Sequence, residues 1–249
     1  MNRFNIHLEE FLSNGFQLKS HLAEYLGKTD EELEKDLSSG IKEMASLHPG
    51  SLKNDDLIGF YESKVGTAHL FELAAWHLAS SDYIADTLRL QSMFANGQVL
   101  DFGGGIGTHS IAAAALPSVE HVFFVDLNPD NRNFVQYRAK QLGLSERLSV
   151  HRDLEGTGEI QFDTVICLDV LEHLADPSSQ LLSFLDRLSA DSIALLNWYF
   201  FKGHQGEYPF HIDDEAIVNK FFLTLQTNFI EVFHPFLITT RAYKPISLN

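Results

Sequence analysis

The amino-acid sequence predicts an α/β fold: a mostly parallel sheet of seven strands with helices on both faces, a helical segment before it and an antiparallel strand pair at its end. From about residue 96 onward, apolar strand patterns alternate with amphipathic helix patterns, which is typical of parallel strands joined by helices. The last two apolar runs are separated only by His234 and Pro235. Because a parallel connection needs about a dozen residues or more, these runs are expected to pair antiparallel.

The first 95 residues carry helical patterns and little strand pattern. Thr29-Asp30-Glu31-Glu32 is a capping box, which predicts a helix from there to about Leu47, and His48-Pro49-Gly50-Ser51 is expected to break it. A further helix is indicated by the helical spacing of four residues, Leu70, Leu73, Ala74 and His77, and another is expected over about residues 82–94. Asn96-Gly97 then predicts a turn into the first strand.

The remaining elements follow from the same patterns. Strands are expected at 98–102, 120–126, 147–151, 162–168, 192–199, 228–233 and 236–242. Helices are expected at about 107–115, 130–142, 177–189 and 213–225.

Composition limits the classes of function. The chain has 249 residues, 45% of them hydrophobic, which is enough for a sizeable core. Its net charge of −16 argues against a general nucleic-acid binder, which normally presents a basic face. The single cysteine, Cys167, lies in an apolar run, so we expect a packing role and a reducing compartment. We find neither a signal-peptide pattern nor a run long enough to span a membrane, and we expect a cytoplasmic protein.

The most informative stretch is Asp101-Phe102-Gly103-Gly104-Gly105-Ile106-Gly107-Thr108. Alternate glycines between a strand and a helix are typical of a loop with positive φ that a nucleoside-bearing ligand approaches closely. An ordinary strand-to-helix turn would also account for them. The dinucleotide fingerprint requires glycine or alanine where this chain has Thr108, which argues against a nicotinamide-dependent oxidoreductase.

Acidic residues close the next strands. Asp126 ends an apolar strand 19 residues after Gly107, at the place where a carboxylate accepts hydrogen bonds from a ribose diol. Asp126 could instead cap the following helix. Asp153 follows the third expected strand, and the run from Phe162 to Leu174 combines an acid, an apolar strand and Leu-Glu-His.

Together these motifs, over about residues 98–200, resemble those of the class I S-adenosylmethionine (SAM)-dependent methyltransferases. The resemblance implies a Rossmann-like methyltransferase fold, with residues 1–95 as a helical cap over the substrate and 96–249 as the SAM-binding core. It implies that Asp126 holds the ribose, with Leu127 beside the adenine, and that Asp153 meets the adenine amino group, with Leu154 as its apolar neighbour. The remaining cofactor-binding residues that it implies are Asp101, Gly103, Gly105, Gly107, Leu168 and Asp169.

A metal site is also predicted. Asp169, Glu172 and His173 have the spacing i, i+3 and i+4, which shares one face of a helical turn. A fourth ligand is expected from the loop Lys202–Asp214, with His211 as first choice and His204 as second. The pattern resembles the ubiquinone-pathway O-methyltransferases and the enzymes that 2′-O-methylate small-RNA 3′ ends, although both usually carry Glu as the first acid. Mg²⁺, Mn²⁺ or Zn²⁺ would suit such ligands.

The expected function is methyl transfer from SAM to a small molecule, at a hydroxyl oxygen. A bound cation would lower the pKa of the hydroxyl; if the site is metal-free, His173 or His211 is the catalytic base. The sequence also allows transfer to nitrogen, to carbon or to an RNA end, and it favours less a nicotinamide-dependent oxidoreductase or a non-catalytic cofactor-binding scaffold. Aromatic residues that are candidates to line the substrate pocket are Phe60, Tyr61, Trp76, Trp198, Tyr199, Phe200 and Phe201. The sequence leaves the oligomeric state open.

Overall fold

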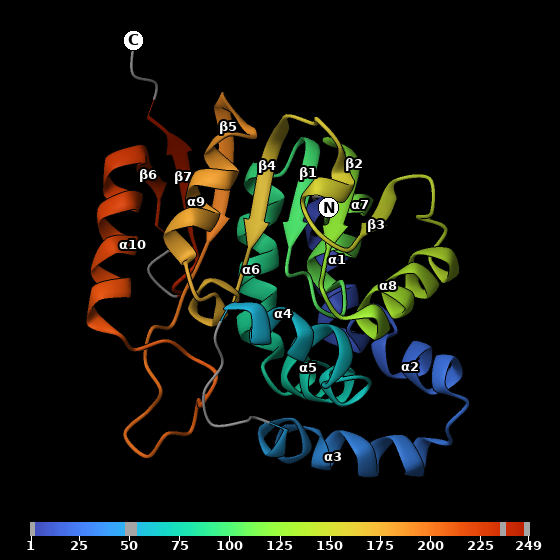
Figure 1. Ribbon diagram of the computed structural model, residues 1–249. Coiled ribbons are helices and arrows are strands. Elements are labelled where there is room, and N and C mark those ends of the chain that lie inside the picture. Colours follow the sequence, from blue (N-terminus) through green and yellow to red (C-terminus); the bar gives the residue numbers. More distant parts are fainter. Residues whose placement is uncertain (1–2, 48–53, 235–237, 247–249) are drawn as a thin grey trace.

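A seven-stranded sheet runs through the part of the chain that the computed structural model describes, residues 3–47, 54–234 and 238–246 (Figure 1). Its order is β3-β2-β1-β4-β5-β7-β6. The strands are β1 (Gly97–Phe102), β2 (Val119–Val125), β3 (Leu148–His151), β4 (Phe162–Cys167), β5 (Leu188–Leu196), β6 (Phe229–Phe233) and β7 (Arg241–Pro245). The first five are parallel, and β7 runs antiparallel to both β5 and β6. The predicted fold class and the antiparallel end of the sheet are therefore confirmed.

Helices precede the sheet and connect its strands. Before β1 come α1 (Arg3–Asn14), α2 (Leu18–Leu26), α3 (Asp30–Ser46), α4 (Asn54–Ser63), α5 (Ala68–Ala79) and α6 (Ser81–Phe94). Between the strands lie α7 (Thr108–Ala115), α8 (Pro129–Gln141), α9 (Pro177–Leu185) and α10 (Glu215–Asn228). The capping box at the start of α3 is formed: Glu32 N–H donates to Thr29 Oγ1 at 3.3 Å, and Thr29 N–H donates to the Glu32 carboxylate at 2.9 Å. None of the helices in the described ranges is long and apolar enough to cross a membrane.

The two faces of the sheet bury different helices. Successive strand residues point to opposite faces, so Val99 packs in a cluster with side chains of α6, α7 and α8, whereas Leu100 packs with side chains of α9 and α10. Cys167 is fully buried in the second cluster and unpaired, as expected for a packing residue.

Several boundaries differ from the expectation. Helix α9 ends at Leu185, and β5 begins already at Leu188 and ends at Leu196. Strand β7 begins only at Arg241. The apolar run before it, expected as strand 236–242, includes Ile238, which is 8% exposed and packs against the sheet from outside any strand, so burial alone produced the strand-like pattern. The expected helix break at 48–51 lies outside the described residues.

The helices before the sheet dock at the ends of the parallel strands. The arrows of β1 and β4 point towards α4 and α5 (Figure 1). Apolar side chains of α2, α3 and α5 form one buried cluster with Ile106, which lies in the loop after β1, and with Phe134 of α8. Helices α2, α3 and α5 therefore lie over the carboxyl edge of the sheet, where ligands of open α/β sheets bind, whereas α6 packs on a face of the sheet.

Candidate functional site at the carboxyl edge of the sheet

The glycine-rich loop after β1 has the backbone conformation that its sequence predicts. Gly103, Gly105 and Gly107 have φ values of +71°, +56° and +74°, in the region that favours glycine. The space that a Cβ would take is filled by protein side chains. The atoms nearest to the three ideal Cβ positions belong to Val170, Leu73 and Val135, at 2.5, 2.9 and 2.6 Å. Close packing against the protein is therefore a reason for these glycines that the sequence analysis, which expected a ligand there, had missed.

Asp126 lies next to this loop, directly after β2, and is 8% exposed. Its carboxylate accepts hydrogen bonds from Gly105 N–H at 2.9 Å, from Asn128 N–H at 2.8 Å and from Asn131 Nδ2 at 3.2 Å. Burial raises the pKa of Asp126 to about 6. The helix that follows is capped by Asn128, whose side chain accepts from Asp130 N–H, so capping is not the task of Asp126.

The side chain of Asp101 also packs against this loop. It is 3% exposed in β1 and accepts a hydrogen bond from Ser110 Oγ of α7 at 2.6 Å. Burial raises its pKa to about 7. Its Oδ2 would lie 2.8 Å from a Cβ on Gly104, so the carboxylate is packed against the loop.

The other predicted cofactor residues lie along the same edge of the sheet, in different surroundings. Asp153 is half-exposed, pairs with Arg152 at 2.6 Å and accepts Gly156 N–H at 2.9 Å. Leu154 packs against the cluster under α9 and α10, and Leu168 packs against the opposite cluster. Leu127 is half-buried directly after Asp126. That these residues contact a cofactor stays a prediction.

Asp169 does not share a helical face with Glu172 and His173, which corrects the argument from spacing. Its φ is +56°, and the short 3-10 turn begins only at Leu171. The Asp169 carboxylate instead accepts a hydrogen bond from Asn197 Nδ2 at 3.1 Å, and its backbone N–H donates to Asn197 Oδ1 at 2.5 Å. Asp169 therefore lies outside the group of candidate metal ligands.

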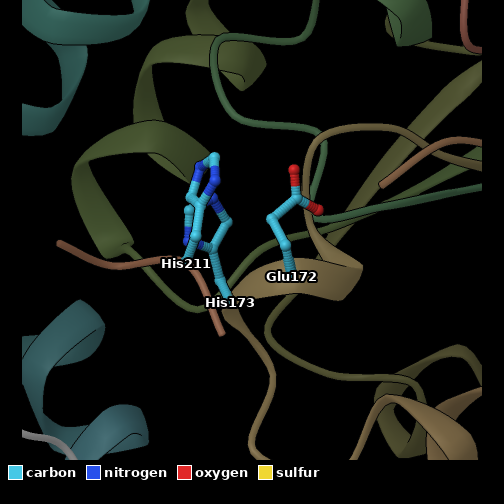
Figure 2. A group of neighbouring side chains, drawn as sticks. All are labelled: Glu172, His173 and His211. Carbon is cyan, nitrogen blue, oxygen red and sulfur yellow. The ribbon is translucent and has the colours of Figure 1, made fainter. Parts of the chain in front are cut away.

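Glu172, His173 and His211 come together as predicted. One potential ligand atom of each lies within 4.8 Å of the others, and Figure 2 shows the two imidazole rings beside each other with the Glu172 carboxylate alongside. His173 Nδ1 lies 3.2 Å from the carbonyl oxygen of Phe210, and His211 Nδ1 lies 3.1 Å from that of Phe201. Both rings thus donate from Nδ1 to a carbonyl and keep the lone pair on Nε2, which is the arrangement of most metal-binding histidines.

The Glu172 carboxylate is the unusual member of this group. Glu172 is 1% exposed, yet neither carboxylate oxygen has a well-aligned hydrogen-bond partner among the described residues; the nearby backbone N–H groups of Glu172 and Tyr199 only partly offset the rise in its pKa. Burial, with the nearby charge of Asp169, raises its pKa to about 8, and burial lowers the pKa of His173 to about 3. A buried carboxylate without well-aligned hydrogen bonds is costly, and a cation would satisfy it. The donor set of one carboxylate and two imidazoles therefore fits a divalent metal. His204, the second choice for a ligand, is not in the group but packs against Phe201.

The helices before the sheet add three residues to this site, of which the sequence analysis named only Tyr61. The Tyr61 ring lies 5.5 Å from that of His69, and His69 Nδ1 is 3.2 Å from Asn131 Nδ2. Burial raises the pKa of Tyr61, and the charges of Glu72 and Asp126 raise it further. Burial also raises the pKa of Glu72 to about 7. His69 and Glu72 lie at i, i+3 on α5, whose other residues are apolar except for His77, and this polar pair could have indicated them.

The aromatic residues after β5 have mostly structural roles. Trp198 and Phe200 pack on Phe221 of α10, with ring centroids 5.0 and 4.9 Å apart. Tyr199 instead reaches Tyr83 of α6, with the two hydroxyl oxygens 3.3 Å apart. Asn197 Nδ2 donates to the same Tyr83 oxygen at 3.0 Å. Tyr83 and Asn197, which sequence reasoning missed, thus connect α6 to Asp169.

Comparisons with known proteins agree with this arrangement. Residues 100–193, from β1 into β5, match a family model described as a methyltransferase domain. The chain carries a class I SAM-dependent methyltransferase domain. Its sequence is 28% identical over 130 residues to the mitochondrial ubiquinone biosynthesis O-methyltransferase of Schizosaccharomyces pombe. That alignment covers 49% of this chain and 46% of the relative, so it spans less than half of the relative's length.

A solved structure shares the fold of this chain. The mitomycin 7-O-methyltransferase MmcR is 14% identical, with a TM-score of 0.54 over 87% of this chain and 67% of that one. For a ribosomal protein L11 methylase from Lactobacillus delbrueckii subsp. bulgaricus, the identity is 15% and the TM-score is 0.49 over 68% of this chain and 80% of that one.

The residues of this chain fit SAM, the cofactor that the matched methyltransferase family implies. A carboxylate has about four acceptor positions, and the three N–H donors to Asp126 leave it able to accept from a ribose hydroxyl. The positive φ values of the adjoining loop let the chain turn sharply beside that carboxylate. Asp126 and the glycine loop are therefore the parts of this chain that would hold the nucleoside.

Proposed function

We propose that this methyltransferase transfers the methyl group of SAM to a hydroxyl oxygen of a small molecule, with a divalent cation held by Glu172, His173 and His211. The observation that carries the proposal is the Glu172 carboxylate, which is buried without a well-aligned hydrogen-bond partner among the described residues, beside two imidazoles whose Nδ1 atoms are already used. The next residue, His173, and His211 from the loop after β5 complete a group of ligands that could bind a cation.

The choice of oxygen rests on two supports. The ubiquinone biosynthesis relative is named as an O-methyltransferase. A cation at this place would lower the pKa of an acceptor hydroxyl and orient it, chemistry that an amine acceptor does not need. A small acceptor is favoured over an RNA end because the chain has a net charge of −16.

The chain's own residues supply the rest. Methyl transfer is an in-line displacement. The acceptor hydroxyl first loses its proton to solvent; its oxygen then forms a bond to the methyl carbon while the sulfonium–carbon bond breaks and S-adenosylhomocysteine leaves. The protein must hold the two reactants in line and exclude water. Phe60, with its ring 5.7 Å from that of Phe210, closes the α4 side of the loop that carries His211. The charges of Asp126 and Glu172 both act on Tyr61, so its side chain lies near the candidate ribose acid and near the candidate metal ligand.

The test measures metal binding first. Protein freed of metal by dialysis against a chelator is titrated with Mn²⁺, Zn²⁺ and Mg²⁺ by calorimetry, in the native form and in the variants Glu172→Gln and Asp169→Asn. We expect one site per chain in the native protein, loss of that site in Glu172→Gln and retention in Asp169→Asn, since Asp169 is held by Asn197. Equal binding by the native protein and Glu172→Gln would refute the site.

Acceptor chemistry is tested separately. The protein is incubated with methyl-labelled SAM and a panel of phenols, alcohols and amines, with and without the chelator. Labelled ethers that form only with metal would support the proposal. Labelled ethers of equal yield after complete chelation would leave His173 or His211 as a simple base, and labelled amines alone would refute transfer to oxygen.

A further inference from the structure

Arg138 of α8 is a buried cation that the proposed chemistry does not use. Its side chain is 0% exposed, and its guanidinium donates to three backbone carbonyls. Nη1 lies 2.9 Å from the oxygen of Ile106, and Nη2 lies 3.0 Å from that of Gly15 and 3.1 Å from that of Phe16. Across residues 3–47, 54–234 and 238–246, no acidic side chain forms an ion pair with it.

This arrangement is specific to an arginine. Burying a cation without an anion costs free energy, which the three hydrogen bonds and the ring of Phe134, whose centroid lies 5.8 Å from the guanidinium carbon, partly offset. The planar guanidinium presents donors in fixed directions, so a single side chain reaches two separate segments. A lysine ammonium has no such fork. These hydrogen bonds therefore indicate that Arg138 connects the two segments and does not only fill space in the core.

The first segment is the turn between α1 and α2. Gly15, Phe16 and Gln17 have φ values of +59°, +55° and +60°, a region that residues with a side chain rarely adopt. Phe16 is fixed by packing on Phe11, with ring centroids 5.5 Å apart. Two successive carbonyls of this turn accept from Arg138, so the guanidinium favours the unusual conformation.

The second segment is the glycine loop. Ile106 lies between Gly105 and Gly107, and its carbonyl accepts from Arg138 while Gly105 N–H donates to Asp126. The loop is thus held from two sides, by the candidate ribose acid and by the guanidinium. The Ile106 side chain is fully buried among side chains of α2, α3 and α5. Its side chain packs on the helices before the sheet, and its carbonyl is linked to the turn between α1 and α2 through Arg138.

We infer that Arg138 is a positioning residue for the cofactor: it connects the α1–α2 turn to the glycine loop, so that docking of the first helices holds the loop in the arrangement that binds SAM. The inference rests on the proposed function for its ligand, SAM, and adds a cause outside the candidate binding residues. It makes cofactor affinity depend on a turn that contains none of them.

The experiment compares Arg138→Lys and Arg138→Met with a matched control, Arg147→Met. Arg147 also donates to two backbone carbonyls, those of Leu116 and Val119, but these lie at the start of β2, at the opposite end of the sheet. Each protein is titrated with S-adenosylhomocysteine by calorimetry, and its thermal unfolding and far-UV circular dichroism are recorded. Amide hydrogen exchange of residues 103–107 reports on the loop itself.

We expect Arg138→Met to weaken S-adenosylhomocysteine binding at least 10-fold and to speed exchange in the loop, with Arg138→Lys between it and the native protein. Arg147→Met should lower the melting temperature with affinity changed less than 2-fold. Native affinity in a folded Arg138→Met would overturn the inference. Loss of affinity in Arg147→Met equal to that in Arg138→Met would also overturn it, because the effect would then be general destabilisation.

A second variant covers the case in which Arg138→Met does not fold. Gly15→Ala perturbs the other end of the connection, because its φ is +59° and its Cβ would lie 3.3 Å from Leu18 Cβ. We expect weaker binding of S-adenosylhomocysteine in Gly15→Ala, and less than additive weakening when it is combined with Arg138→Lys. Full additivity or unchanged affinity in Gly15→Ala contradicts the coupling. If the native protein itself does not bind S-adenosylhomocysteine, the proposed function fails together with the inference.

Discussion

Asn197 holds Asp169 from two directions: its Oδ1 accepts the Asp169 backbone N–H at 2.5 Å, and its Nδ2 donates to the Asp169 carboxylate at 3.1 Å. The pair joins the ends of the neighbouring strands β4 and β5. It also stabilises the left-handed conformation of Asp169, where φ is +56°. Because Asp169 is engaged in this way, the metal-ligand group formed by its neighbours does not include it.

Removing the Asn197 amide should therefore destabilise the fold. In Asn197→Ala, the N–H and carboxylate of the half-buried Asp169 lose their partner, and we expect the free energy of unfolding to fall by about 1–3 kcal/mol, as for polar groups left unpaired inside a protein. Urea denaturation measures the change. Tyr199→Phe is the matched control, because Tyr199 hydrogen-bonds at the half-exposed end of the same network, and we expect a loss of less than about 0.5 kcal/mol there. Equal losses in the two variants would contradict the role of Asn197.

Two of the predicted cofactor acids, Asp126 and Asp153, should differ in their effect on binding. Asp126→Ala removes a buried carboxylate that adjoins the glycine loop, and we expect S-adenosylhomocysteine affinity to fall by about 1.5–3 kcal/mol, the worth of hydrogen bonds to a charged group. Asp153→Ala removes a half-exposed acid that pairs with Arg152, and the expected loss is below about 1 kcal/mol. Calorimetric titration of both variants with S-adenosylhomocysteine measures the two losses of affinity. If Asp153→Ala proves the more damaging, the adenine end of the site contributes more to binding than the ribose acid.

The sequence predicted the strands of the sheet. It did not predict that Asp169 lies apart from the other candidate metal ligands, because that depends on the backbone conformation of a single residue. Alternation of apolar residues located the strands, since burial on both faces leaves a clear pattern in Val99 and Leu100. The spacing of Asp169 to His173 suggested one helical face, but the positive φ of Asp169 delays the turn. Periodicity carries no information on a single left-handed residue.

The sequence also did not predict contacts between segments that are far apart in the chain. His69 and Glu72 reach the site because α5 docks on the glycine loop through Leu73, and no local pattern encodes that docking. Arg138 shows the same limit. In the sequence it is one of many charged residues of a surface-like helix, whereas its three carbonyl partners lie 32 and more than 120 positions away.

The glycine loop should tolerate no side chain at Gly105. In Gly105→Ala the residue keeps a φ of +56°, and its Cβ meets Leu73 Cδ1 at 2.9 Å. We expect a loss of stability of about 1–2 kcal/mol from the backbone conformation alone, and weaker S-adenosylhomocysteine binding. Gly156→Ala is the control, because Gly156 has no positive φ and its nearest neighbours lie at 3.5 Å or beyond. Adding Leu73→Ala should remove the close contact with the new Cβ but not the cost of the positive φ. Full recovery in that double variant would show that the φ value costs nothing.

The contribution of Asp101 to the free energy of unfolding depends on pH. Because burial raises its pKa, this contribution decreases as pH rises. Its pKa in the folded protein is raised from 3.8 to about 7, so the folded state binds a proton that the unfolded state releases at lower pH. The contribution to stability is fully present below pH 3.8 and is lost as pH rises through about 7. Between pH 5 and pH 8, the free energy of unfolding should therefore fall by about 2–3 kcal/mol on account of this group.

Asp101→Asn isolates that contribution. The amide oxygen still accepts the Ser110 hydroxyl proton, but the group no longer titrates. We expect the variant to gain about 2–3 kcal/mol relative to the native protein as pH rises from 5 to 8, because only the native protein must then bury a carboxylate charge. Urea denaturation at several pH values gives the two curves, and their difference cancels the titration of all other groups that do not interact with Asp101. Asp126 does interact with it, and both are carboxylates, so their coupling raises the pKa of Asp101 and strengthens the trend. Parallel curves would mean that Asp101 keeps its charge throughout this range, stabilised by Ser110 and the loop beside it.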